Sequence, residues 1–242
     1  MRLAQIVFSQ GFGTRRDCVG LILNGLVSVG GRVADDPDEE IEPTGLRFAV
    51  QGREWEYHAR ALLMLNKPAG YECSRKPKHH PGVLSLLPPP LRQREVQPIG
   101  RLDEDTTGLL LLTDDGALIH RLTSPKRHVP KVYEVGTKHE VTDAQVQALR
   151  AGVVLDDDPV IVRAAACDRS GEHALRLTLT EGKYHQVKRM VAAAGNRVET
   201  LHRASFGALR LPTDLAPGQW RWVEAAEIDP ARDAEAAEPA AD

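Results

Sequence analysis

The sequence has few cysteines, few aromatic residues and no long apolar run. Its 242 residues include three cysteines, and 5% of them are Phe, Trp or Tyr. Cys18, Cys73 and Cys167 lie far apart, which does not fit a paired zinc motif, and their odd number does not fit a disulfide framework. We therefore expect three reduced thiols and no metal site.

Membrane and cofactor signals are also missing. No apolar run approaches the ~18 residues of a membrane-spanning helix, and the amino terminus lacks the apolar stretch of a signal peptide. The sequence has no glycine-rich phosphate loop and no clustered metal ligands. The adjacent His79 and His80 have no supporting cysteine or acid, so we expect them in a surface loop. We predict a cytoplasmic, globular protein with no membrane partner and no cofactor.

An excess of positive charge is absent from the chain as a whole. The formal net charge is −3, which taken alone disfavours a nucleic-acid partner. Residues 227–242 carry a net −5, so the preceding residues carry about +2. Residues 116–133 contain four Lys or Arg and no acid, and residues 183–210 contain six Lys or Arg and one acid. These two segments indicate a nucleic-acid-binding face, and solvated faces without a partner are the alternative.

The first fifty residues predict a small module of a helix and a β-ribbon. Thr14 with Asp17 three residues later is typical of a helix start, and Asn24-Gly25 of a helix stop. Alternation over residues 27–33 around Gly30-Gly31 predicts a hairpin with positive φ. The apolar positions of the helix are Val19, Ile22 and Leu23.

Short segments join this module to the rest of the chain. Residues 35–42 contain six acids and predict a solvated loop, whereas residues 46–50 and 54–57 read as strands. A linker follows near residues 58–60. The last twelve residues, 231–242, are rich in Ala, Glu, Asp and Pro, and we expect an acidic disordered tail there.

The larger part alternates short strand patterns with few helices. Residues 109–112, four leucines, predict a strand buried on both faces, and residues 175–179 predict a half-buried strand. Thr142 with Gln145 opens a helix that Gly152 closes, and residues 187–194 show helical spacing. The pattern predicts an α+β fold with a mixed, largely antiparallel sheet flanked by helices, after a small α/β module.

An acidic residue lies in a glycine-bounded turn just ahead of the leucine strand. Asp103 belongs to the segment GRLDEDTTGLLLLTDDG, residues 100–116. An aspartate in a turn usually caps that turn, so this position needs support from other motifs before it is taken as functional. Asp114 and Asp115 precede a helical pattern and are better explained as helix N-cap residues.

The motifs resemble those of bacterial pseudouridine synthases that modify ribosomal RNA. The blocks are GRLD at residues 100–103, LNKPAGYECS at 65–74, KVYEV at 131–135, EGKYHQVKRM at 181–190 and LHRASFGALRL at 201–211. HQVKRM and LAPGQWR, residues 215–221, favour the branch that acts on the small subunit. The first residues resemble the S4 RNA-binding domain, although Ala4 and Gln5 stand where that domain usually has Asp-Lys.

The resemblance implies an S4-like domain at 1–58, a pseudouridine synthase domain at 59–230 and the tail at 231–242. It implies that the chain, as a monomer, isomerises a specific uridine of 16S ribosomal RNA by base flipping, glycosidic bond cleavage and reattachment through C5. The partner would be that RNA or a small-subunit assembly intermediate. Three alternatives stay open: a synthase for large-subunit RNA, a non-catalytic RNA-binding assembly factor, and a nucleosidase that releases the base.

The resemblance also implies roles for single residues. Asp103 would be the catalytic carboxylate, Tyr133 would stack on the uracil, and Lys188 would pair with Asp103 where the wider family commonly has arginine. Arg189 competes with Lys188 for that pairing. Neighbouring acids could supply a second carboxylate, but alternation of side chains along an extended turn disfavours Glu104 and Asp105.

RNA contacts are expected from a larger set of residues. Arg101 would enter the space left by the flipped nucleotide, and Lys67 in the NKPAG turn is a weaker candidate for phosphate. The full set is Arg101, Lys67, Arg189, His185, Gln186, Arg15, Arg16, Lys126, Arg127 and Lys131.

Overall fold

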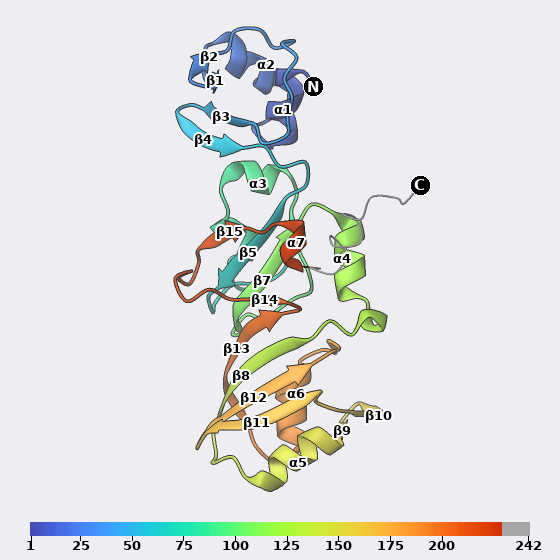
Figure 1. The fold of residues 1–242 in the computed structure, drawn as a ribbon. Helices are drawn as coiled ribbons and strands as arrows, with labels where there is room; N and C mark the ends of the chain where they lie inside the picture. The colour runs from blue at the N-terminus through green and yellow to red at the C-terminus, as the bar shows by residue number, and fades with distance from the viewer. Residues whose placement is uncertain (229–242) are drawn as a thin grey trace, which may run out of the picture. The chain divides into compact units, whose positions relative to one another are not determined.

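The computed structural model describes residues 1–228, in two compact units (Figure 1). One unit comprises Met1–Ala61 with Leu84–Gln97, and the other comprises Leu62–Val83 and the chain from Pro98 onward. The segment Leu84–Gln97 thus belongs to the first unit, although the sequence predicted one uninterrupted domain from residue 59. The predicted tail at 231–242 lies outside the described residues.

The first unit packs two helices on a four-stranded sheet of order β2-β1-β3-β4. Thr14 and Asp17 form a reciprocal capping box at the start of α2, as predicted, and Gly30 and Gly31 have positive φ in the predicted hairpin. Leu23 was predicted on the apolar face of α2, but it is 63% exposed, because the helix buries Cys18 and Ile22 instead. The elements are α1 Leu3–Ser9, α2 Arg15–Leu23, β1 Val27–Val29, β2 Arg32–Val33, β3 Arg47–Val50, β4 Arg53–Glu56 and α3 Pro89–Gln93.

The second unit is built on a nine-stranded sheet, which confirms the predicted α+β class. Its main order is β11-β12-β8-β13-β7-β5-β15, and β13 with β7 is the parallel pair among antiparallel ones. The strands are β5 Leu62–Lys67, β6 Gln97–Pro98, β7 Thr107–Thr113, β8 Lys131–Thr137, β11 Ala166–Gly171, β12 Ala174–Leu179, β13 Val198–Phe206, β14 Leu209–Arg210 and β15 Trp220–Trp222. A separate ribbon joins β9 Val153–Leu155 to β10 Asp158–Val162.

Helices pack on this sheet through two apolar clusters. Side chains of α5 and α6 join those of β8, β12 and β13 in one cluster, and α4 joins β5 and β7 in another. Residues 109–112 of β7 are fully buried, so the predicted strand with two buried faces is confirmed. The helical elements are η1 Val83–Leu86, α4 Gly116–Thr123, η2 Pro125–Arg127, α5 Asp143–Ala151, α6 Gln186–Ala193 and α7 Ala225–Ile228.

Helix starts in this unit follow the predicted caps. Asp115 accepts hydrogen bonds from the backbone of Ala117 and Leu118 at the start of α4, which confirms it as the N-cap. Thr142 and Gln145 form a capping box on α5. Within residues 1–228, no helix combines the length and apolar character needed to cross a bilayer.

Candidate active site

Asp103 lies in the loop between β6 and β7, where short-range contacts fix the backbone. Its carbonyl accepts a hydrogen bond from the Thr106 amide, which closes a turn one residue before β7 begins. The preceding Leu102 is buried and anchors the loop to the core. The Asp103 side chain is 31% exposed, so the carboxylate is partly sheltered at the end of a fully buried strand.

Two basic side chains from the start of α6 meet this carboxylate. His185 Nε2 lies 3.2 Å from Asp103 Oδ1, and Lys188 Nζ lies 3.3 Å from Asp103 Oδ2. His185 is the N-cap residue of α6 and has a left-handed backbone, with φ of 46°. That conformation is uncommon outside glycine, and residues held in it cluster at functional sites. The predicted pairing of Asp103 with Lys188 is present.

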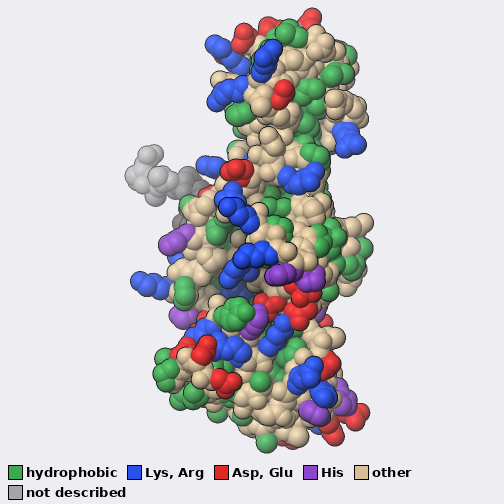
Figure 2. Space-filling view, turned by 180° about the vertical axis from the view of Figure 1, so that it is seen from behind, with side chains coloured by type: hydrophobic (Ala, Val, Ile, Leu, Met, Phe, Trp, Pro, Cys, Tyr) green, Lys and Arg blue, Asp and Glu red, His purple; other side chains and the backbone are tan. Residues whose placement is uncertain are grey.

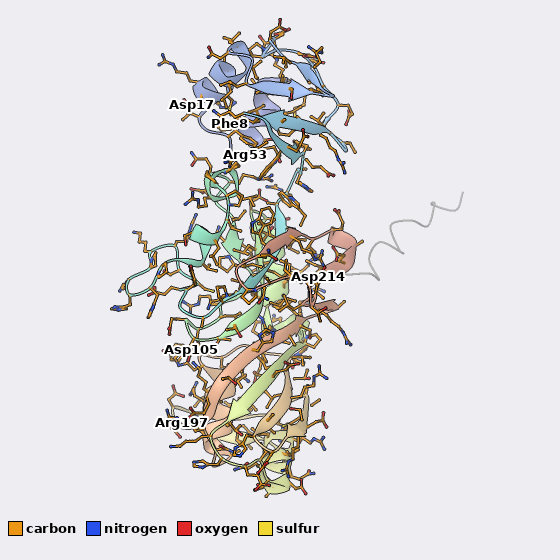
Figure 3. All side chains as sticks on the ribbon, turned by 90° about the vertical axis from the view of Figure 1, so that its left-hand side faces the viewer. Phe8, Asp17, Arg53, Asp105, Arg197 and Asp214 are labelled. Atoms are coloured by element: carbon orange, nitrogen blue, oxygen red, sulfur yellow. The ribbon has the colours of Figure 1, made fainter. Side chains whose placement is uncertain are left out.

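Asp105 also binds Lys188, which the sequence did not predict. Lys188 Nζ donates to both carboxylate oxygens of Asp105, at 2.7 and 2.8 Å, so Lys188 lies between two acids. Alternation disfavoured this placement, but the loop turns at Asp103 and Thr106 and is not extended there. Asp105 is labelled in Figure 3.

Charge and burial have opposite effects on the pKa values of Lys188 and Asp105. Burial acts to lower the pKa of Lys188, but its hydrogen bond to Asp105 and the charges of Asp103 and Asp105 outweigh burial and raise that pKa. Burial likewise opposes ionisation of Asp105, yet the hydrogen bond from Lys188 holds the pKa of Asp105 below its ordinary value. Lys188 therefore stays protonated and can neutralise carboxylate charge beside the cavity.

A cavity of about 180 Å³ opens next to Asp103. Tyr133 on β8 lines it together with Asp103, so the structure brings the predicted phenol and carboxylate to one cavity. Arg101, which is exposed, and Lys131 also line it. Other lining residues include Gly100, Leu102, Thr106, Ser124, Leu179, Glu181, Lys183, His185, Gln186, Lys188, Leu201, Arg203 and Phe206.

Lys131 is a half-buried cation at this cavity. Its ammonium donates to the carbonyl of Val129 at 2.8 Å and lies 5.2 Å from the centre of the Phe206 ring. Burial, with a smaller contribution from the charge of Arg203, lowers the pKa of Lys131 to about 8. Lys131 thus titrates within reach of physiological pH.

Arg189, the competitor of Lys188, is engaged elsewhere. Its guanidinium pairs with Asp157 and donates to the Tyr184 carbonyl. Lys188, one residue earlier on α6, is the cation that contacts Asp103. The two neighbours point to different partners because successive residues on a helix are about 100° apart.

Two predicted RNA contacts are corrected by the structure. Lys67 is fully buried, and its ammonium donates to the carbonyls of Pro68, Glu104 and Thr106 at 2.8 to 3.0 Å. It therefore holds the loop around Asp103 and is not available to phosphate. Gln186 is 4% exposed, and its amide bonds to Glu181 and to the backbone of Lys183, so it orders the loop before α6.

The other predicted RNA-binding residues are accessible in their own units. Arg15 and Arg16 are exposed at the start of α2, and Arg15 lies 4.6 Å from the centre of the Phe8 ring. Lys126 and Arg127 are exposed in η2. On the face in Figure 2, basic, acidic and histidine side chains are interspersed, so that face has no continuous field of one sign.

Metal binding has no support in the described part of the chain. No group of three or more His, Cys, Asp or Glu side chains there is arranged to hold an ion. His79 and His80 are exposed, in agreement with the predicted surface loop, and their amides donate to the carboxylate of Glu72.

Arg203 is a cavity residue that the sequence did not predict. Arg203 is 2% exposed in the middle of β13, and its Nε donates to the Leu109 carbonyl at 2.8 Å. The available signal was its position within the LHRASFGALRL block, in a strand whose neighbours are apolar or small. A charged residue at such a position is rarely buried without a function.

A carboxylate, a phenol and several cations that meet at one cavity form the arrangement of an enzyme active site. The RNA pseudouridylate synthase family matches residues 61–193, and the S4 domain matches residues 1–45. The chain belongs to the RNA pseudouridylate synthase family, which confirms the resemblance and the enzyme class.

Relatives match along nearly the whole chain. An uncharacterized RNA pseudouridine synthase, YtzG, of Bacillus subtilis strain 168 is 39% identical over 231 residues, which cover 94% of this chain and 97% of that protein. Ribosomal small subunit pseudouridine synthase A of Escherichia coli strain K12 is 38% identical and covers 94% and 98%. A crystal structure of a pseudouridylate synthase aligns with a TM-score of 0.66 at 33% identity, covering 94% and 98%.

Proposed function

We propose that this enzyme converts one specific uridine of 16S ribosomal RNA into pseudouridine, with Asp103 as the catalytic carboxylate. The observation that carries this proposal is the position of Asp103, in contact with Lys188 and His185 at the cavity that Tyr133 lines. Such a cavity suits an extruded nucleoside, because a base within a duplex cannot reach buried groups.

The reaction needs little besides a placed carboxylate. The C1′–N1 bond breaks, the uracil turns, C5 bonds to C1′, and C5 loses a proton while N1 gains one. Atoms balance without an oxidant or an energy source. Asp103 would act on the sugar as a nucleophile or by stabilising positive charge at C1′. Lys188 would hold the Asp103 carboxylate in place through the contact at 3.3 Å.

Tyr133 and Arg101 would handle the base and the strand. Tyr133 would stack on the uracil, since its ring lines the cavity from β8. Arg101, exposed at the cavity, would occupy the space that the flipped nucleotide leaves in the RNA. Phosphate contacts are assigned to exposed cations, which are Arg15, Arg16, Lys126 and Arg127.

The small-subunit substrate is supported by the relatives. The Escherichia coli relative covers 94% of this chain, and its name states that it acts on the small ribosomal subunit. A second relative of that name, from Yersinia pestis, is 47% identical over 166 residues, or 69% of this chain. We infer the same class of substrate here, as free 16S RNA or as an assembly intermediate, recognised by a monomer.

The deciding experiment maps pseudouridines in ribosomal RNA from cells that lack this protein, complemented with variants. Loss of one small-subunit site, restored by the wild type but not by Asp103→Asn, is expected. Asp105→Asn is the matched control, because it removes the same charge two residues away in the same loop and should restore at least part of the modification. Restoration by Asp103→Asn would contradict the catalytic role, and loss of a large-subunit site would contradict the substrate.

A further inference from the structure

Arg203 presents a buried donor to the cavity. Its side chain lines the cavity and is 2% exposed, and Nε is held by the Leu109 carbonyl. The terminal nitrogen Nη2 is buried and has no hydrogen-bond partner within residues 1–228. An unsatisfied buried donor is unfavourable, and a charged one more so, so its presence in a folded protein calls for a partner.

The strands place Arg203 beside the groups that would handle the base. Arg203 is paired directly with Tyr133 on β8 and with Gly108 on β7. Residues directly opposite each other on antiparallel strands share one face of the sheet, so the Arg203 and Tyr133 side chains lie together. Gly108 lets β7 approach the backbone of Arg203 closely, because a Cβ there would lie 2.4 Å from the Arg203 carbonyl oxygen.

Arg203 has no carboxylate partner within the described residues. None of the ion pairs within the described residues includes Arg203, and its ring neighbour is Phe206, whose centre lies 5.4 Å from Cζ. The nearby Lys131 is also a cation, and it lines the same cavity. Asp103 and Glu181 line the same cavity, but neither forms an ion pair with Arg203, and a guanidinium without an acidic partner is suited to a ligand that carries acceptors.

We propose that Arg203 Nη2 donates a hydrogen bond to a carbonyl oxygen of the target uracil, an inference that rests on the proposed function. Uracil offers acceptors at O2 and O4, whereas cytosine has an amino donor in place of O4, and a guanidinium can only donate. When the C1′–N1 bond breaks, its electron pair stays on the base, and the negative charge spreads to these oxygens. A hydrogen bond to either oxygen becomes stronger at that point and favours bond cleavage.

The test compares RNA whose target uridine is intact, 2-thiouridine or 4-thiouridine, because sulfur accepts hydrogen bonds poorly. Single-turnover rates at saturating RNA are measured for the wild type, Arg203→Gln and Arg203→Lys. Arg203→Gln should react about 10²-fold more slowly with unmodified RNA, the usual effect of losing one donor to a developing anion. One of the two sulfur substitutions slows the wild type by a certain factor. In Arg203→Gln, that factor should be several-fold smaller. Arg101→Gln is the control, and each sulfur substitution should slow it by the same factor as it slows the wild type.

The experiment distinguishes a failure of the Arg203 contact from a failure of the proposed function. If the wild type fails to modify the unmodified RNA, the substrate assignment fails. If the wild type is active and reacts equally fast with all three RNAs, the Arg203 contact is refuted, whether or not its variants fold. Unchanged sulfur penalties in folded Arg203→Gln or Arg203→Lys would also refute it and leave Arg203 a structural residue.

Discussion

A single ammonium lies between two carboxylates in this site, and the two contacts are unequal. Lys188 is 3.3 Å from Asp103 but makes hydrogen bonds of 2.7 and 2.8 Å to Asp105. Lysine is a compact charge on a flexible stem, without the fork that lets arginine bind one carboxylate twice. Asp105 therefore anchors Lys188, and the looser contact leaves Asp103 able to change partners when a nucleoside enters the cavity.

Removing this ammonium should slow the reaction. Lys188→Met is expected to lower the single-turnover rate on target RNA by about 10²-fold, a typical effect of removing one electrostatic contact to a reacting group. The affinity for RNA should change much less, because the ammonium is engaged by carboxylates. Arg189→Met is the matched control on the same helix, and it should leave the rate near the wild-type value, because Arg189 pairs with Asp157 and not with Asp103. Similar rates for Lys188→Met and the wild type would show that Asp103 works without the pair.

Some residue roles could be predicted from the sequence, and others depend on distant segments. The motif match identified Asp103, Tyr133 and Lys188, and the structure brings all three to one cavity. Lys67 was misassigned because its partners include carbonyls nearly forty residues away, which no local pattern reveals. Asp105 was set aside because alternation assumes an extended chain, whereas the backbone turns there.

Helix starts with side-chain caps were predictable, and helix α6, which has no side-chain cap, was predicted from its apolar spacing instead. Thr14, Asp115 and Thr142 each accept backbone hydrogen bonds at helix starts, and all three starts were predicted. Helix α1 begins after Arg2, which makes no side-chain cap, and was missed. The sheet class followed from strand spacing, but the parallel pairing of β13 with β7 is a tertiary feature.

That parallel pairing requires a glycine in β7. Gly108 has φ of +102°, and a Cβ there would lie 2.4 Å from the Arg203 carbonyl oxygen. Gly108→Ala should lower the free energy of unfolding by about 2–4 kcal/mol, since it combines a strained φ with a clash against backbone. Denaturant unfolding measures this. Gly116→Ala, at the start of α4 with open space around it, should change stability by only about 0.5 kcal/mol. Equal effects of the two substitutions would contradict the close approach.

At the scale of the molecule, net charge is a poor guide to the partner. The chain is acidic overall at −3, yet residues 116–133 contain no acid, and two of their cations, Lys126 and Arg127, are exposed. RNA binding should therefore depend on local cations. The logarithm of the binding constant should fall linearly with the logarithm of salt concentration, by about 0.7 per phosphate neutralised in single-stranded RNA.

This salt dependence should itself change with pH through Lys131, whose pKa is about 8. Below pH 8 the ammonium is mostly charged and above pH 8 it is mostly neutral, so at pH 9 most of the protein lacks this charge. We expect weaker binding at pH 9 than at pH 7, with a salt slope shallower by about 0.7 if Lys131 neutralises one phosphate. Lys131→Met should give the shallow slope at both pH values, and Lys126→Met should lower the slope but keep its change with pH. Identical wild-type slopes at both pH values would mean that Lys131 does not serve RNA binding.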